Sequence, residues 1–154
     1  MANEILKMNL DQSCICLDLQ SQNRDEAIGE LVGLLHIKHK FESADEVLRV
    51  ILEREKKMST AIENGVAVPR AKTALVKKPM VAVGIGRKGI DFKSTDGRPT
   101  QIIVSVISPS SGNDQHMRCL AEITRLMQSE GTRKKIIEAK DTETIYRIMS
   151  ETGE

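Results

Sequence analysis

The sequence predicts a single α/β domain in which helices flank a central mixed β-sheet. Two stretches near the N-terminus and three near the C-terminus carry apolar residues at helical spacing. Between them lies a block of short alternating or wholly apolar segments, which is typical of strands. No repeat, low-complexity tract or linker interrupts the 154 residues. We therefore expect one domain over 1–154, with its core over about 10–151.

The first predicted elements are a strand and two helices. Residues 15–19 are apolar and alternating after a polar leader, which predicts a strand. Asn23 and Ser43 are each followed three positions later by Glu, a pattern that predicts two helix N-termini. We expect the first helix to reach about His36 and the second to end in the charged cluster 53–57.

A block of strands follows the two helices. Residues 66–68 alternate until Pro69, which lacks an N–H and must end the strand or place it at an edge. Residues 80–85 predict a second strand. The glycine-rich run 84–89 does not match a dinucleotide-binding loop, so we interpret it as a turn between strands. Residues 102–107 predict a strand that is buried on both faces.

Three more helices complete the predicted domain. The first follows a polar loop at 110–113 and is expected to turn one row inward: Met117, Leu120, Ala121, Ile123, Thr124 and Met127. A short helix is predicted over 132–139. The last helix begins after Asp141, with Ile145, Ile148 and Met149 on its inner face.

The composition argues against several classes of protein. The net charge of +1 gives no overall attraction to nucleic acid or membrane. One Tyr, two Phe and no Trp leave too few aromatic faces for stacking single-stranded bases. No window approaches the roughly 20 apolar residues of a membrane span, so we expect no membrane insertion. Three cysteines without an export signal favour a cytoplasmic location.

Neither a metal nor a cofactor is expected. Cys14 and Cys16 would share one face of a strand, but no second Cys/His pair follows nearby, so a structural role is favoured. His36 and His39 fall at a helix C-terminus, where the helix dipole stabilises a cation. Three other residues are harder to explain as structural: Arg54, Arg70 and His116. Arg54 lies on the edge of an apolar helical stripe, and His116 lies in the first turn of a predicted helix. Arg70 follows Pro69 at the end of a predicted strand, where loops conventionally carry function.

Several motifs, taken together, resemble a known family. The segment around Arg54-Glu55, the pair Ser59-Thr60 and the run 64–69 are similar to the active-site region of type-2 enzyme IIA domains. These belong to the fructose/mannitol class of the bacterial sugar phosphotransferase system, which includes nitrogen-regulatory proteins. Further motifs match in the same order at 89–92, 96–99 and 114–116. The resemblance covers nearly the whole chain.

The resemblance assigns roles to individual positions. Arg54 matches an arginine that lines the site and is expected to contact the phosphoryl group. His116 matches a histidine that neighbours the phosphorylated one. Arg70 stands where the family carries its phospho-accepting histidine, followed by Ala71 in place of glycine and by the usual Lys72. The resulting anion- or partner-binding set is Arg54, Arg70, His116, Ser59 and Thr60.

The arginine changes the expected chemistry. A guanidinium stays cationic and offers no lone pair, so Arg70 cannot act as the acceptor. We therefore expect a regulatory module that binds partners such as an HPr-like phosphocarrier, a transporter or a sensor kinase. The alternatives are a phosphocarrier that uses His116 and a small phosphate-sensing module. A surface ion pair between Arg70 and a nearby carboxylate such as Glu63 would be the structural explanation. Family members occur as monomers and dimers, so a homodimer stays open.

Overall fold

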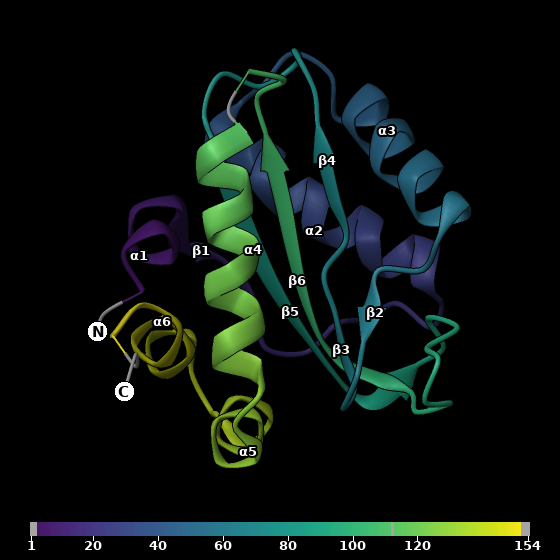
Figure 1. Ribbon diagram of the computed structural model, residues 1–154, viewed down its shortest axis with the longest axis vertical. Coiled ribbons are helices and arrows are strands. Elements are labelled where there is room, and N and C mark those ends of the chain that lie inside the picture. The colour runs from purple at the N-terminus through teal and green to yellow at the C-terminus, as the bar shows by residue number, and fades with distance from the viewer. Residues whose placement is uncertain (1–2, 112, 152–154) are drawn as a thin grey trace.

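The computed structural model describes residues 3–111 and 113–151, which form three layers with the sheet in the middle (Figure 1). One layer of helices consists of α2 (Arg24–His39) and α3 (Ala44–Lys57). The other consists of α1 (Glu4–Asn9), α4 (Asn113–Met127), α5 (Glu130–Glu138) and α6 (Thr142–Glu151). The prediction of an α/β domain with a helix-flanked sheet is confirmed.

The sheet is mixed, as expected. Its strands are β1 (Leu10–Cys16), β2 (Ala61–Ile62), β3 (Val66–Ala67), β4 (Arg70–Lys72), β5 (Met80–Ile90) and β6 (Thr100–Ser108). The spatial order is β1-β5-β6-β3-β2, and β4 also pairs with β6. Strands β5 and β6 are antiparallel, whereas β1 runs parallel to β5, and both β3 and β4 run parallel to β6.

The two predicted N-caps are present. The side chain of Asn23 accepts a hydrogen bond from the Glu26 N–H at 2.9 Å, and Ser43 Oγ accepts one from Glu46 N–H at 3.2 Å. Each bond satisfies an N–H that has no partner within its helix. The first of these helices continues three residues beyond the predicted His36.

The N-terminal leader, for which no element was predicted, is structured. It contains α1, and β1 begins at Leu10 and ends before Leu17, whereas the sequence predicted a strand over 15–19. The carboxylate of Glu122 on α4 accepts bonds from the N–H groups of Ile5 and Leu6, at 3.1 and 2.9 Å. Since this cap is distant in sequence, no local pattern could predict the short helix.

The glycine-rich run is part of a strand, so its interpretation as a turn is wrong. Strand β5 passes through Gly84 and Gly86 and reaches Ile90, with an irregular register after Ile85. A Cβ on Gly84 would lie 2.9 Å from the Leu19 side chain. The glycine is therefore explained by close packing inside the sheet rather than by a reversal of the chain.

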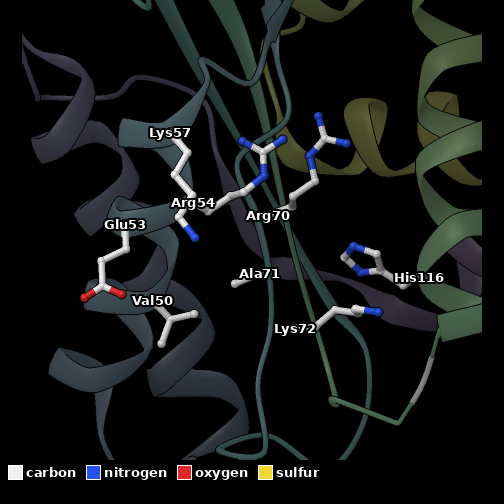
Figure 2. Close-up of a pocket in the computed structure, with 8 residues that line it drawn as sticks. All are labelled: Val50, Glu53, Arg54, Lys57, Arg70, Ala71, Lys72 and His116. Atoms are coloured by element: carbon white, nitrogen blue, oxygen red, sulfur yellow. The ribbon is translucent and has the colours of Figure 1, made fainter.

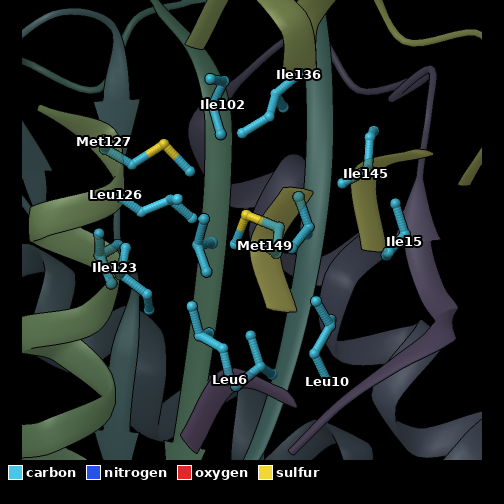
Figure 3. Close-up of a cluster of buried hydrophobic side chains, with 14 of the residues drawn as sticks. Leu6, Leu10, Ile15, Ile102, Ile123, Leu126, Met127, Ile136, Ile145 and Met149 are labelled. Carbon is cyan, nitrogen blue, oxygen red and sulfur yellow. The ribbon is translucent and has the colours of Figure 1, made fainter. Parts of the chain in front are cut away.

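Apolar residues fill both faces of the sheet. On the face covered by α1, α4, α5 and α6, the cluster in Figure 3 includes Leu6, Ile15, Ile102, Ile123 and Met149. On the face covered by α2 and α3, the corresponding residues include Ile28, Leu31, Ile51, Ile103 and Ile107. Successive residues of β6 alternate between the two clusters, which confirms a strand buried on both faces.

The inward row of α4 is rotated relative to its prediction. Met117 is 56% exposed, and Ala121 and Thr124 are exposed as well. The buried row instead includes His116, Cys119, Ile123, Leu126 and Met127. His116 faces inward with this row and makes a hydrogen bond with Ser108 of β6, a polar contact that an apolar pattern alone does not reveal.

Strand β3 ends at Ala67, before Pro69, and β4 begins directly after the proline. Strands β3 and β4 both run along β6, and between them the Pro69 carbonyl accepts from the Val106 N–H at 2.9 Å. Alternation places Val68, Arg70 and Lys72 on one face of this edge. Val68 lies in the core, while the two basic residues continue beyond it towards the end of β6.

Candidate functional site

A pocket of ≈ 340 Å³ lies at the open edge of β4, between α3 and α4 (Figure 2). Side chains from three elements line it: Val50, Glu53, Arg54 and Lys57 from α3, Arg70, Ala71 and Lys72 from β4, and His116 from α4. The structure thus brings Arg54, Arg70 and His116 together, although Arg54 and His116 are 62 positions apart in the sequence.

Arg70 is half-buried, with its guanidinium beside that of Arg54 (Figure 2). Its Nε donates to the Val68 carbonyl at 3.2 Å, and its terminal N–H groups have no partner among the described residues. Burial lowers the pKa of Arg70, and the charge of Arg54 lowers it further, while the charge of Glu55 opposes the change. Arg70 forms no ion pair with Glu63 in the described part of the chain, and the carboxylate whose charge acts on it is that of Glu55.

Arg54 lies in the last turn of α3. Its Nη1 donates to the carbonyl of Met58 at 2.8 Å, beyond the C-terminal end of the helix. This bond restrains the long side chain and also satisfies a carbonyl outside the helix. The remaining donors of the guanidinium make no hydrogen bond to any other described residue, so they can bind a ligand in the pocket.

His116 reaches from α4 towards β4 and is 6% exposed (Figure 2). Its Nδ1 is 2.8 Å from the hydroxyl oxygen of Ser108 at the end of β6. Burial lowers the pKa of His116, as do the charges of Lys72 and Arg70. The imidazole is therefore held neutral near pH 7. Lys72 Nζ in turn donates to the Asn113 side chain at 2.7 Å.

Ser59 and Thr60 are not among the described residues that line the pocket. The Ser59 hydroxyl donates to the Phe92 carbonyl and accepts from the Ala61 N–H. The Thr60 N–H and hydroxyl both donate to the carboxylate of Glu55, at 2.9 and 2.6 Å. Both residues fix the chain between α3 and β2, so they support the pocket wall indirectly.

The pocket carries a local excess of positive charge. Its lining has four basic side chains, Arg54, Lys57, Arg70 and Lys72, against the single carboxylate of Glu53. The chain as a whole has a net charge of only +1. Two guanidinium groups, two ammonium groups and an imidazole suit a tetrahedral oxyanion, because planar forks bind such groups through paired hydrogen bonds. Within the described residues, no three His, Cys, Asp or Glu side chains are grouped to hold a metal ion.

Reasoning from sequence missed three groups at this site. Lys57 follows Arg54 by three positions, so helical spacing could have placed both on one face. Glu55 is only 2% exposed but appears in the sequence within a charged cluster that looks solvent-facing. Ser108 carries no local signal, because its role depends on a helix that packs across the end of its strand.

Comparison with known proteins identifies the family. Residues 8–152 match the family described as "Phosphoenolpyruvate-dependent sugar phosphotransferase system, EIIA 2". The chain is 31% identical over 142 residues to the fructose-specific EIIABC component of Bacillus subtilis, covering 92% of this chain but 22% of that protein. It is 30% identical over 140 residues to the fructose-specific EIIA component of Haloferax volcanii, with 91% of each chain covered.

Solved structures share the fold. The nitrogen regulatory protein IIA-Ntr of Neisseria meningitidis superposes with a TM-score of 0.89 at 24% identity, covering 96% of this chain and 100% of that one. The enzyme IIA of the Escherichia coli mannitol system, solved in complex with phosphorylated enzyme IIB, gives 0.80 at 17% identity, covering 92% and 96%. No helix among residues 3–111 and 113–151 is long and apolar enough to cross a membrane. Because the family match spans nearly the whole chain, the protein belongs to the type-2 EIIA family of the phosphoenolpyruvate-dependent sugar phosphotransferase system.

Proposed function

We propose that the protein is a regulatory EIIA-like domain that binds protein partners around the pocket and accepts no phosphoryl group at the family's usual position. The observation that carries this proposal is Arg70. The sequence resemblance aligns it with the phospho-accepting histidine, and its half-buried guanidinium lies in the pocket beside Arg54. A guanidinium has no lone pair with which to attack phosphorus.

Relatives with regulatory or docking roles support this choice. The chain is 32% identical over 104 residues to a nitrogen regulatory protein of Bradyrhizobium diazoefficiens, covering 68% of each. The mannitol enzyme IIA was solved bound to its phosphorylated enzyme IIB. We infer that this domain likewise docks on a protein in the cytoplasm, with an HPr-like phosphocarrier, a transporter or a sensor kinase as the partner classes. Exposed Met58 and Met117, adjacent in sequence to the pocket wall, offer apolar contact area.

Two other functions have an observation in their favour. His116 has a neutral imidazole whose Nε2 makes no hydrogen bond among the described residues, which favours a phosphocarrier that uses it. The excess of basic groups in the pocket favours a module that senses free phosphate compounds. Both functions are separable from partner docking by experiment.

Phosphorylation is the first test. The protein is incubated with phosphoenolpyruvate, enzyme I and HPr from the same organism, and its intact mass is measured. We expect no added phosphoryl group on the natural chain. We expect one on an Arg70→His variant, because an imidazole at this position is a competent nucleophile. A stoichiometric gain on the natural chain that is lost in His116→Ala would instead establish the phosphocarrier.

Partner binding is the second test. Arg70→Ala should weaken the affinity for phosphorylated HPr roughly tenfold or more, since hydrogen bonds to charged groups contribute about 1.5–3 kcal/mol. Arg147→Ala is the matched control, because Arg147 makes an exposed ion pair with Glu143 on α6, remote in the fold from the pocket. If neither substitution changed any partner affinity, the proposed interface would be wrong.

A further inference from the structure

A buried serine holds the histidine of the pocket. Ser108 is the last residue of β6 and is fully buried. Its carbonyl accepts from the Thr73 N–H at 2.9 Å, while its hydroxyl lies 2.8 Å from His116 Nδ1. No other hydrogen bond is made by this hydroxyl in the described part of the chain. The ring is therefore fixed through Nδ1, and Nε2 is the nitrogen left for a ligand.

The hydroxyl can serve both charge states of the ring. When His116 is neutral, Ser108 Oγ–H can donate to Nδ1, and Nε2–H then points to the pocket. When His116 is protonated, Nδ1–H donates to the same oxygen instead. A rotation of one hydroxyl hydrogen is enough to change roles. An alanine in this place would leave the Nδ1–H of a buried imidazolium without a partner, which disfavours the charged state.

The charges around the ring favour protonation only when an anion is present. Helix α3 contributes Arg54, Lys57 and Glu53, with Glu55 behind them. Strand β4 contributes Arg70 and Lys72, and exposed Asp114 precedes the histidine on α4. In the empty pocket the basic groups oppose a further positive charge. A bound dianion would offset them and would add an acceptor for Nε2–H.

We propose that this pocket is a proton-linked oxyanion site, in which His116 takes up one proton from solvent as a tetrahedral dianion binds. Ser108 is the positioning residue that permits this uptake, because its hydroxyl oxygen accepts from the Nδ1–H of the protonated ring. No covalent bond forms or breaks. The inference uses the same pocket as the proposed function but concerns its occupation, not the transfer of a phosphoryl group. The ligand class is a phosphoryl or related oxyanion.

The test uses inorganic sulfate, whose charge is constant between about pH 5 and 8, the range in which histidine titrates. Affinity is measured by calorimetry across that range, and nitrogen NMR of labelled histidines follows the tautomer and protonation of His116. We expect sulfate to bind roughly tenfold more tightly at the acidic end, which corresponds to about 1.4 kcal/mol. We also expect the imidazole of His116 to titrate at higher pH in the sulfate complex than in the free protein.

Four variants separate positioning from general stability. Ser108→Ala should still bind sulfate through the arginines, but with a pH dependence reduced to near zero and a lower pKa for His116. Ser108→Thr keeps the hydroxyl and should restore both. His116→Gln, a permanent neutral donor, should bind without pH dependence. Ser105→Ala is the matched control, because Ser105 is equally buried in β6 and its hydroxyl has no partner among the described residues.

The outcomes distinguish this inference from the proposed function. A sulfate affinity that does not change with pH in the natural chain, or a Ser108→Ala variant with natural pH dependence and His116 titration, would overturn the proton linkage. Neither result bears on phosphoryl acceptance. Conversely, a mass gain in the phosphorylation assay would overturn the proposal that the site accepts no phosphoryl group. The linkage between proton uptake and anion binding would still be decided by the sulfate data alone.

Discussion

At the scale of single residues, Glu55 connects the charged pocket to the backbone behind it. Its buried carboxylate accepts two hydrogen bonds from Thr60, and its negative charge faces Arg70. A buried charge is tolerated when hydrogen bonds and an opposite charge compensate for lost hydration. Glu55 meets both conditions, so its contribution combines stability of the loop with placement of the Arg70 guanidinium.

We predict that Glu55→Gln lowers the free energy of unfolding by about 1–3 kcal/mol, because one acceptor oxygen is lost and an amide is buried in its place. Urea denaturation followed by circular dichroism measures this change. Glu53→Gln on the same helix is exposed and should stay within about 0.5 kcal/mol of the natural chain. Equal effects of the two substitutions would show that burial of Glu55 contributes nothing.

At this scale, the sequence predicted some residues of the pocket but not the direction of every side chain. The resemblance to type-2 enzyme IIA domains implied that Arg54, Arg70 and His116 share one site, and the structure brings them into one pocket. The same motifs included Ser59 and Thr60, whose hydroxyls bond elsewhere. Side-chain direction in a loop depends on contacts across the fold, such as the one from Ser59 to the Phe92 carbonyl. A sequence motif therefore indicates which residues lie near the site, but it does not indicate the direction of their polar side-chain atoms.

At the scale of elements, the glycines of β5 are explained by close packing and backbone conformation rather than by a turn. Gly89 has a φ of +85°, and a Cβ built there would lie 2.7 Å from the Pro99 side chain. Both backbone conformation and space therefore require glycine at this point. The irregular register that follows Ile85 lets the long strand end beside the start of β6.

We predict that Gly89→Ala lowers the free energy of unfolding by about 1–3 kcal/mol through strain and steric overlap. Gly97→Ala is the matched control. Gly97 also has a positive φ, of +72°, but apart from Gly97 and its two chain neighbours no atom of the described residues lies within 4 Å of the added Cβ. Thermal and urea unfolding of both variants measure the difference, which isolates the contact with Pro99. If Gly97→Ala were as unstable as Gly89→Ala, backbone strain alone would account for the loss of stability.

Local signals predicted the elements that are determined locally. The caps at Asn23 and Ser43 and the buried strand β6 follow from neighbouring residues, and these predictions are confirmed. The helix α1 is held by Glu122, more than a hundred positions away, and was missed for that reason. The buried row of α4 follows helical spacing through Cys119, Ile123 and Leu126, and the prediction was wrong where it placed exposed residues such as Met117 on the inner side.

At the scale of the whole molecule, groups with lowered pKa values predict how stability depends on pH. The pKa of Asp96 is lowered to about 2 from 3.8, chiefly by hydrogen bonds from Ser94, Arg98 and Asn64. Its contribution is therefore complete above pH 3.8 and is lost as pH falls towards 2. His39 and His116 also have lowered pKa values, mainly because of burial. Their neutral forms favour folding, so stability falls as pH drops below about 6.5.

We predict two successive losses of stability on acidification, one below about pH 6.5 and a second below about pH 4. Urea midpoints measured over this range detect both. Asp96→Asn should weaken the second loss and leave the first unchanged, because the substituted side chain cannot take up a proton. A variant that retains the full acidic loss would assign it to the other carboxylates with lowered pKa values, Asp11, Asp91 and Asp141.

The contact between the two ends of the fold has a consequence for chain architecture. The side chain of Asn3 donates to the Met149 carbonyl at 2.9 Å, so the first and last described segments meet at one corner, with the pocket on the other side of α4 (Figure 1). A polypeptide spliced into a longer host at these points would enter and leave together. The domain would then be attached to the host at one place, with its positively charged pocket facing outward. The same proximity should let a short tether join the ends and new termini be opened in a surface loop, a circular permutation that leaves the cavity whole.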